Sequence, residues 1–314
     1  MKEVGPSVPA HIKPGTQVLL AYTSCKTCPN CLSGSNAYCT SLRALNFSGQ
    51  RPCSSPPTTA VKTSSGQDLK SFFFGQSSMT RLALVDHRSL VPVALSAQDL
   101  VLSAALTCGL QTGASSILNL AKPSPGSRIA IIGAGSVGLS AALAARLTHP
   151  SVLAVVDTSE AKLSLIPEVL RKESFFSALD SSKHTLDELL KSASETGFDF
   201  ILDCAGSPAV LSSAAHALAP RGLLLTVGGS APGASVQLEI NSFLVGGRTY
   251  RGTHQGDAVS GVFLPELLSL WKKGLYPFET LVRKYKFEQV QDAVEDLGEG
   301  RCIKALFVTG NAQE

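Results

Sequence analysis

The chain has 314 residues, of which 44% are hydrophobic and 16% are charged, and its 27 basic and 24 acidic side chains leave a formal net charge of +3. This length suits two globular domains, and the mixed charges contain no basic block of the kind that binds nucleic acid. No apolar run is long enough for a membrane span or a signal sequence, so we expect a cytoplasmic protein whose eight cysteines are thiols or metal ligands rather than disulfides.

The first predicted strand covers residues 18–24 and leads into a cluster of four cysteines, CKTCPNCLSGSNAYC at 25–39. Four thiolates at this spacing can fill the tetrahedron around Zn²⁺ and leave no position for water or substrate. We therefore predict a structural zinc; free thiols in a loop and an iron–sulfur cluster are the alternatives. The predicted ligands are Cys25, Cys28, Cys31 and Cys39.

Residues 46–68 are rich in Ser, Pro, Gly and Thr and predict an irregular loop, and residues 80–93 predict a second β segment. The segment between them contains Phe72, Phe73 and Phe74, which either line an apolar pocket or pack in the core. We expect Cys53 in the loop, and likewise Cys204 and Cys302, to be structural or incidental thiols.

From about residue 98 the pattern changes to helical segments that alternate with short apolar strands, at 128–133, 152–157, 199–206 and 223–229. Such alternation is typical of a parallel, doubly wound sheet. The first of these strands runs directly into GAGSVG, with Gly133, Gly135 and Gly138, and then into an amphipathic helix. In this context the motif predicts a site where a dinucleotide pyrophosphate rests on the helix N-terminus.

The next predicted strand ends at Asp157, 19 residues after Gly138. A carboxylate there can accept hydrogen bonds from both ribose hydroxyls and would repel a 2′-phosphate, which favours NAD over NADP. The alternative is a carboxylate that caps a turn. Beyond residue 250 the sequence predicts helices around 265–274 and 287–300 and a final strand at 301–309.

A four-cysteine lobe upstream of GAGSVG resembles the zinc-containing alcohol dehydrogenases of the medium-chain dehydrogenase/reductase superfamily. Three segments are most similar in sequence to the aryl-alcohol dehydrogenase branch of this family: SFFFGQSSMTRLALVD, LTCGLQTGASSILN and KYKFEQVQDAVEDLGEGRCIKALF. The resemblance implies an α/β fold in which a Rossmann domain, at 98–250, is inserted in a GroES-like β-rich catalytic domain, at 1–97 and 251–314. It also implies a small-molecule alcohol or carbonyl substrate, and a homodimer or tetramer.

The resemblance further assigns roles to single residues. Cys108 matches the last protein ligand of a catalytic zinc, and Lys162 and Lys304 match basic residues near the adenosine ribose and the pyrophosphate. The coenzyme-binding set implied by the family is Gly133, Gly135, Ser136, Val137, Gly138, Asp157, Lys162, Val227 and Lys304.

Members of this family carry further catalytic ligands upstream of the region matched here, so we expect the GroES-like domain to lack its first strands and Cys108 to be the remaining ligand candidate. Three hypotheses about the function remain. The chain is either an NAD(H)-dependent zinc alcohol dehydrogenase, or an NAD-binding short form without a catalytic zinc, or a zinc-independent reductase on the same scaffold.

Overall fold

The computed structural model describes residues 1–51, 59, 61–77, 79–80 and 82–309, which form two compact units. Cys53 and the middle of the Ser/Pro-rich loop lie outside the described residues. Of the described residues, the first unit comprises 1–108 and 258–266 with Thr309, and the second comprises 109–257 and 267–308. The chain changes from one unit to the other after residues 108, 257, 266 and 308, so helix α11 (Ser260–Lys272) contributes residues to both units.

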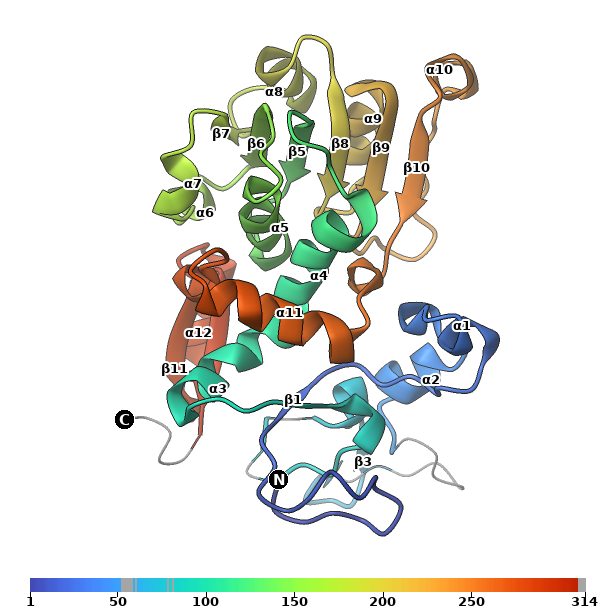
Figure 1. The fold of residues 1–314 in the computed structure, drawn as a ribbon, viewed down its shortest axis with the longest axis vertical. Coiled ribbons are helices and arrows are strands. Elements are labelled where there is room, and N and C mark those ends of the chain that lie inside the picture. Colours follow the sequence, from blue (N-terminus) through green and yellow to red (C-terminus); the bar gives the residue numbers. More distant parts are fainter. Residues whose placement is uncertain (52–58, 60, 78, 81, 310–314) are drawn as a thin grey trace. The chain divides into compact units, whose positions relative to one another are not determined.

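The first unit consists of short strands and helices (Figure 1). Strand β1 pairs with β4 antiparallel, Leu19 lying opposite Val91, and β2 pairs with β3 in a second two-stranded sheet. The element bounds are β1 Val18–Leu20, α1 Pro29–Leu32, α2 Leu42–Phe47, β2 Val61–Lys62, β3 Asp68–Leu69, β4 Leu90–Pro92 and α3 Ala97–Ser103. Of the predicted strands at 18–24 and 80–93, only residues 18–20 and 90–92 are therefore in strands.

The second unit is built on a six-stranded parallel sheet in the order β10-β9-β8-β5-β6-β7. Its strands are β5 Arg128–Ile132, β6 Val152–Asp157, β7 Phe176–Asp180, β8 Phe198–Asp203, β9 Leu218–Thr226 and β10 Thr249–Gly252. The order reverses direction at β5, as in a doubly wound Rossmann sheet, and this confirms the predicted fold class. The sequence analysis identified neither β7 nor β10.

Helices connect the strands, and a separate strand pair completes this unit. The helices are α4 Gly109–Ser115, α5 Ser136–Arg146, α6 Glu160–Ser164, α7 Glu168–Arg171, α8 Leu186–Ala193, α9 Pro208–His216, α10 Ile240–Gly246 and α12 Val290–Gly298. Helix α4 continues into a π-helical stretch, Ser116–Ala121. Strands β11 (Val282–Lys286) and β12 (Lys304–Val308) pair in parallel; β12 lies within the final strand predicted at 301–309, whereas β11 was not predicted.

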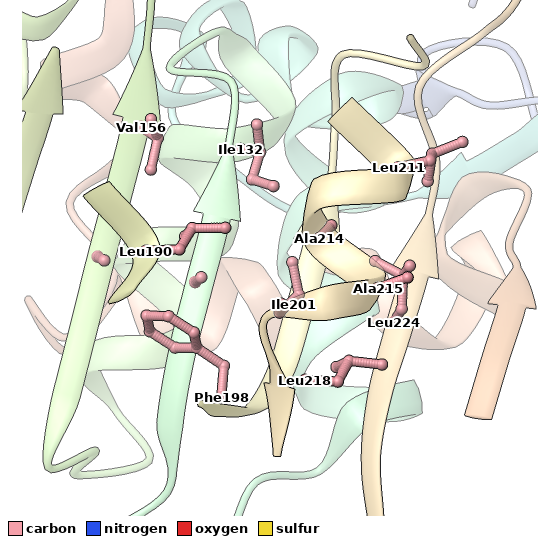
Figure 2. Close-up of a cluster of buried hydrophobic side chains, with 12 residues drawn as sticks. Ile132, Val156, Leu190, Phe198, Ile201, Leu211, Ala214, Ala215, Leu218 and Leu224 are labelled. Carbon is pink, nitrogen blue, oxygen red and sulfur yellow. The ribbon is translucent and has the colours of Figure 1, made fainter. Parts of the chain in front are cut away.

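The core of the second unit lies on both faces of the sheet. On one face, α9 and α8 cover apolar strand residues, and Figure 2 shows Ala215 of α9 beside Leu224 of β9. On the other face, α5 packs against β5 and β6. Because strand side chains alternate between the faces, Ile131 and Ile132 of β5 point into opposite layers, and both are buried. This explains why the strands read as continuous apolar runs.

Within the part of the chain that the structure describes, no single helix is long and apolar enough to cross a membrane, although the bent pair Ala97–Thr107 and Gly109–Ala121 meets the same criteria of length and composition.

Candidate functional site

The four predicted zinc ligands converge in the first unit. The sulfur atoms of Cys25, Cys28, Cys31 and Cys39 all lie within 4.8 Å of one another, and Cys25 Sγ and Cys31 Sγ are 3.9 Å apart. A tetrahedral site with Zn–S bonds of about 2.3 Å requires sulfur–sulfur separations of about 3.8 Å. The four side chains therefore fit Zn²⁺ after a small contraction, and they leave no coordination position open to substrate.

Backbone geometry brings these sulfurs together. Lys26 has φ 65°, in the left-handed region, and this tight turn lets the N–H groups of Thr27 and Cys28 donate to Cys25 Sγ at 3.5 and 3.3 Å. Cys28 is the N-cap residue of the short helix α1, which carries Cys31, and the Cys25 N–H donates to Cys39 Sγ at 3.2 Å. Hydrogen bonds of this kind favour the thiolate form, which is the form that binds zinc.

The pKa values of Cys25 and Cys39 are shifted in opposite directions. Hydrogen bonding from the Thr27 side chain, followed by bonds from the Thr27 and Cys28 backbone, lowers the pKa of Cys25 to about 5. Burial raises the pKa of Cys39 to about 11. Because neighbouring negative charges repel, all four thiols can ionise together only when a cation compensates them, as a divalent metal does.

Residues outside the cluster hold its ends in place. Asn46 is fully buried and binds the backbone of Thr23 twice, its Oδ1 accepting from the N–H and its Nδ2 donating to the carbonyl, both at 2.8 Å. Arg88 donates to the Cys25 carbonyl at 3.4 Å and forms a two-point ion pair with Asp86. The Arg88 side chain, through its hydrogen bonds, lowers the pKa of Asp86. The lobe is thus tied to the segment that precedes β4.

The dinucleotide motif lies in the second unit, at the carboxyl end of β5. Gly133 has φ 109°, and its N–H donates to the Val156 carbonyl at 2.7 Å. A Cβ on Gly138 would lie 1.8 Å from the Gly133 carbonyl oxygen, so helix and strand meet at a distance that only glycine permits. By contrast, a Cβ on Gly135 would meet no atom within 4 Å. The motif is therefore closed toward the core at Gly138 and open at Gly135.

The open space beside Gly135 lies at the N-terminus of α5. Gly135 is the N-cap, no side chain caps the first turn, and Ser136 and Val137 are half-buried. The first amides of an α-helix have no partner within the helix, and the helix dipole favours an anion beside them. The eleven-residue helix α5 thus presents donors where the sequence predicted a pyrophosphate.

Asp157 ends β6, and both of its carboxylate oxygens accept backbone hydrogen bonds. Ala134 N–H donates to Oδ2 at 2.7 Å, and Ser159 N–H donates to Oδ1 at 2.8 Å. The carboxylate therefore connects the glycine turn to the start of α6, which agrees with the alternative that it caps a turn. Each oxygen has a further lone pair, so the same carboxylate can also accept from a ligand hydroxyl.

Lys162 and Lys304, the two lysines to which the family resemblance assigned coenzyme contacts, lie in different surroundings. Lys162 is half-buried in α6, where its N–H donates to the capping Ser159 hydroxyl at 3.3 Å. Gly300 packs against the same place, since a Cβ there would lie 3.1 Å from Lys162 Cγ. Lys304 is half-buried and begins β12, opposite Val282.

The carboxyl ends of β8 and β9 are joined by Asp203, a residue that the sequence analysis did not select. Asp203 is fully buried; its Oδ1 accepts from the N–H groups of Ala205 and Gly206 at 2.9 and 3.0 Å, and its Oδ2 accepts from Thr226 Oγ1 at 2.7 Å. The Val227 N–H donates to the Asp203 carbonyl at 2.9 Å. This network fixes the strand end that carries Val227. An acidic residue at the end of an apolar strand was the available signal.

Cys108 ends the 3₁₀ turn Ala104–Thr107 and immediately precedes α4. It is half-buried. Among the described residues, the one group of three or more histidine, cysteine or acidic side chains that could hold a metal is the Cys25–Cys39 cluster, and Cys108 does not belong to it. A catalytic zinc needs three protein ligands and one open position. The described residues therefore do not supply a ligand set for a catalytic zinc.

The three consecutive phenylalanines have different environments. Phe72 is buried, Phe73 is 64% exposed and Phe74 is half-buried. Phe73 and Phe74 form edge-to-face contacts with each other and with Phe47, with ring centroids 4.8–5.9 Å apart. Phe72 and Phe74 both have positive φ, a rare conformation for bulky residues. Core packing thus accounts for Phe72, whereas the other two rings form a partly exposed aromatic cluster.

Comparison with known proteins agrees with this geometry. A family model described as zinc-binding dehydrogenase matches residues 136–271. The chain is 33% identical over 300 residues to geraniol dehydrogenase of Castellaniella defragrans, in an alignment that covers 95% of this chain and 78% of that protein.

Two solved structures are similar to the whole chain. The first, an alcohol dehydrogenase zinc-binding domain protein from Burkholderia ambifaria, has a TM-score of 0.88 and 34% identity over 98% of this chain and 81% of its own. The second, benzyl alcohol dehydrogenase from Acinetobacter calcoaceticus, has a TM-score of 0.86 and 31% identity over the same shares of the two chains. The chain therefore belongs to the zinc-binding alcohol dehydrogenases of the medium-chain dehydrogenase/reductase superfamily.

Proposed function

We propose that this chain is an NAD(H)-dependent oxidoreductase that interconverts an alcohol and its aldehyde or ketone. The observation that carries the proposal is the glycine turn of α5, which is open at Gly135 and braced by Asp157 at the end of the next strand. Together they offer amides for a pyrophosphate and a carboxylate for a ribose, in the order that a dinucleotide requires.

The same residues favour NAD over NADP. The Asp157 carboxylate would accept hydrogen bonds from the ribose hydroxyls and would repel a 2′-phosphate. We assign the pyrophosphate to the turn from Gly133 to Gly138, including Ser136 and Val137. The adenosine ribose is assigned to Asp157 and Lys162, the nicotinamide to the strand end at Val227, and Lys304 is proposed as a further basic contact to the pyrophosphate.

We assign Zn²⁺ to Cys25, Cys28, Cys31 and Cys39, where it would stabilise the lobe between β1 and α2. Four thiolate ligands exclude substrate, so this metal would contribute folding free energy rather than chemistry. Cysteines that serve as metal ligands rather than disulfides suit a reducing compartment, so we propose a cytoplasmic location.

The chemistry proposed on the coenzyme side is hydride transfer. When bound, NAD⁺ would accept a hydride from the carbinol carbon and become NADH, the hydroxyl proton would pass to solvent, and the reverse reaction would reduce the carbonyl compound. The family resemblance makes Cys108 a ligand of a catalytic zinc, but the described residues lack the other ligands. We therefore assign no step to that metal.

An apolar, bulky alcohol is the proposed substrate class. Two similar proteins are named for geraniol and benzyl alcohol, and both alcohols are unsaturated and largely apolar. In this chain, Phe47, Phe73 and Phe74 offer a partly exposed aromatic surface of the matching chemistry.

A second candidate function is favoured by the incomplete ligand set around Cys108: a protein that binds NAD(H) without oxidising alcohols. Calorimetric titration with NAD⁺ and NADP⁺, followed by an assay of NADH formation with benzyl alcohol and geraniol, separates the two. Binding with turnover supports the oxidoreductase, and binding without turnover supports the second candidate. Absence of NAD⁺ binding would exclude both.

We also propose that the chain pairs with a second copy through the edge of the sheet. Strand β10 is an edge strand with four exposed residues, and neighbouring α10 has no buried residue while Ile240, Leu244 and Val245 are 76–82% exposed. An unpaired edge beside an apolar patch is a template for association. Light scattering should show a dimer or tetramer, and the double variant Leu244→Lys/Val245→Lys should reduce its mass.

A further inference from the structure

A fully buried serine on α5 is bonded into the backbone of α4. The Ala114 N–H donates to Ser140 Oγ at 3.1 Å, and the Ser140 hydroxyl donates to the Leu110 carbonyl. These two backbone groups are four residues apart, and a regular α-helix pairs such groups directly. The hydroxyl of one helix therefore bridges a turn of the other.

The bridge uses the whole bonding capacity of the hydroxyl. A serine has one donor and accepts two hydrogen bonds. The third partner is the buried Tyr276 hydroxyl, 2.7 Å away, which donates because the Ser140 proton points to Leu110. Burial raises the pKa of Tyr276, so its proton is retained. No other residue type of this size offers one donor and two acceptor positions.

Two glycines of α4 also lie directly against the first turn of α5. A Cβ on Gly113 would lie 2.0 Å from the Val137 carbonyl oxygen, and a Cβ on Gly109 would lie 2.9 Å from Ser136 Oγ. Residues 136 and 137 belong to the first turn of α5, where the coenzyme pyrophosphate is assigned. Any shift of α4 along α5 would therefore displace the amides of that turn.

We propose that Ser140 is a positioning residue for the coenzyme: its hydroxyl holds α4 in one register against α5 and thereby fixes the amides at the α5 N-terminus. Ser140 lies one turn beyond Ser136 and does not itself reach the pyrophosphate position. The inference rests on the proposed function, because it concerns the same coenzyme site.

The other side of α4 supplies a matched control. Ser115 is also fully buried on this helix, but its hydroxyl donates to the Gly256 carbonyl at 2.6 Å, away from α5. Ser115→Ala and Ser140→Ala each remove one buried hydroxyl from the α4 environment. A merely structural role predicts similar effects of the two substitutions on every property, including coenzyme binding.

The test compares NADH affinity, by fluorescence titration, in the wild type, Ser140→Ala, Ser115→Ala and Ser140→Thr. Ser140→Ala should raise the Kd about tenfold, since the bridge loses both backbone partners, whereas Ser115→Ala should stay within about twofold. Ser140→Thr keeps the hydroxyl and should recover most of the affinity. Equal Kd values for the two alanine variants would overturn the proposal.

Hydrogen exchange without coenzyme separates this inference from the proposed function. Ser140→Ala should accelerate amide exchange in both 109–115 and 136–140, while Ser115→Ala should accelerate it in 109–115 alone. If the wild type does not bind NADH, the proposed function fails, but faster exchange at 136–140 still supports the bridge. Unchanged exchange at 136–140 in Ser140→Ala would refute it in either case.

Discussion

The second and third glycines of the dinucleotide motif, Gly135 and Gly138, should respond oppositely to the same substitution. A Cβ on Gly138 would lie 1.8 Å from the Gly133 oxygen, whereas carbon and oxygen normally stay about 3.3 Å apart. Gly138→Ala must therefore move the N-terminus of α5 by roughly 1.5 Å away from the end of β5. Because overpacking of this kind costs about 3 kcal/mol, we expect the melting temperature to fall by roughly 6 °C or more.

Gly135→Ala has the opposite profile. Gly135 has φ −81°, which alanine adopts readily, and a Cβ there meets no protein atom within 4 Å. We expect the free energy of unfolding to change by less than about 0.5 kcal/mol. The added methyl group would project into the space assigned to the pyrophosphate and should raise the Kd for NAD⁺ at least about tenfold.

Thermal melting and calorimetric titration of both variants and the wild type measure the two effects separately. The reasoning holds if Gly138→Ala mainly loses stability and Gly135→Ala mainly loses affinity. A Gly135→Ala protein with unchanged NAD⁺ affinity would show that the pyrophosphate does not rest at this turn. A Gly138→Ala protein as stable as the wild type would show that helix and strand are not in the close contact described.

Three further predictions concern the metal, an ion pair and the coenzyme. Cys31→Ser should remove bound zinc from the purified protein by elemental analysis and lower its melting temperature; retention of zinc would contradict the four-ligand site. Hydrogen bonds from Arg128 lower the pKa of Asp199 below its unfolded value near 3.9, so the pair stabilises the fold above that pH and this contribution disappears as the pH falls through the folded pKa. Urea titrations should therefore show Asp199→Asn less stable than the wild type at pH 7, with the difference shrinking below about pH 4, and a pH-independent difference would refute this assignment. Asp157→Ala should weaken NAD⁺ binding more than NADP⁺ binding in calorimetry, because the carboxylate that repels a 2′-phosphate is gone; an equal loss for both coenzymes would indicate a purely structural carboxylate.

The features that the sequence predicted well depend on local patterns. Strands β5, β6, β8 and β9 are buried on both faces, so they appear as short apolar runs bounded by turns. The cysteine cluster depends on spacing within fifteen residues, and its sulfurs do converge. The predicted domain boundaries at 97 and 250 and the individual coenzyme contacts remain predictions.

The features that were missed depend on partners far away in sequence. Strand β10 is exposed at all four residues, and β7 has no fully buried residue, so neither shows an apolar run. Asp203 reaches Thr226 across 23 residues, and Ser140 reaches Tyr276 across 136. A buried carboxylate or hydroxyl gives no periodic signal, because its role is defined by whatever the fold places beside it.

The central claim is tested most directly by following NADH formation when the purified, zinc-loaded protein is mixed with NAD⁺ and benzyl alcohol or geraniol, and NADH consumption with the corresponding aldehydes. The account predicts turnover in both directions and a clear preference for NAD⁺ over NADP⁺. Tight NAD⁺ binding without turnover in either direction would contradict the oxidoreductase and identify the chain as a coenzyme-binding member of its family.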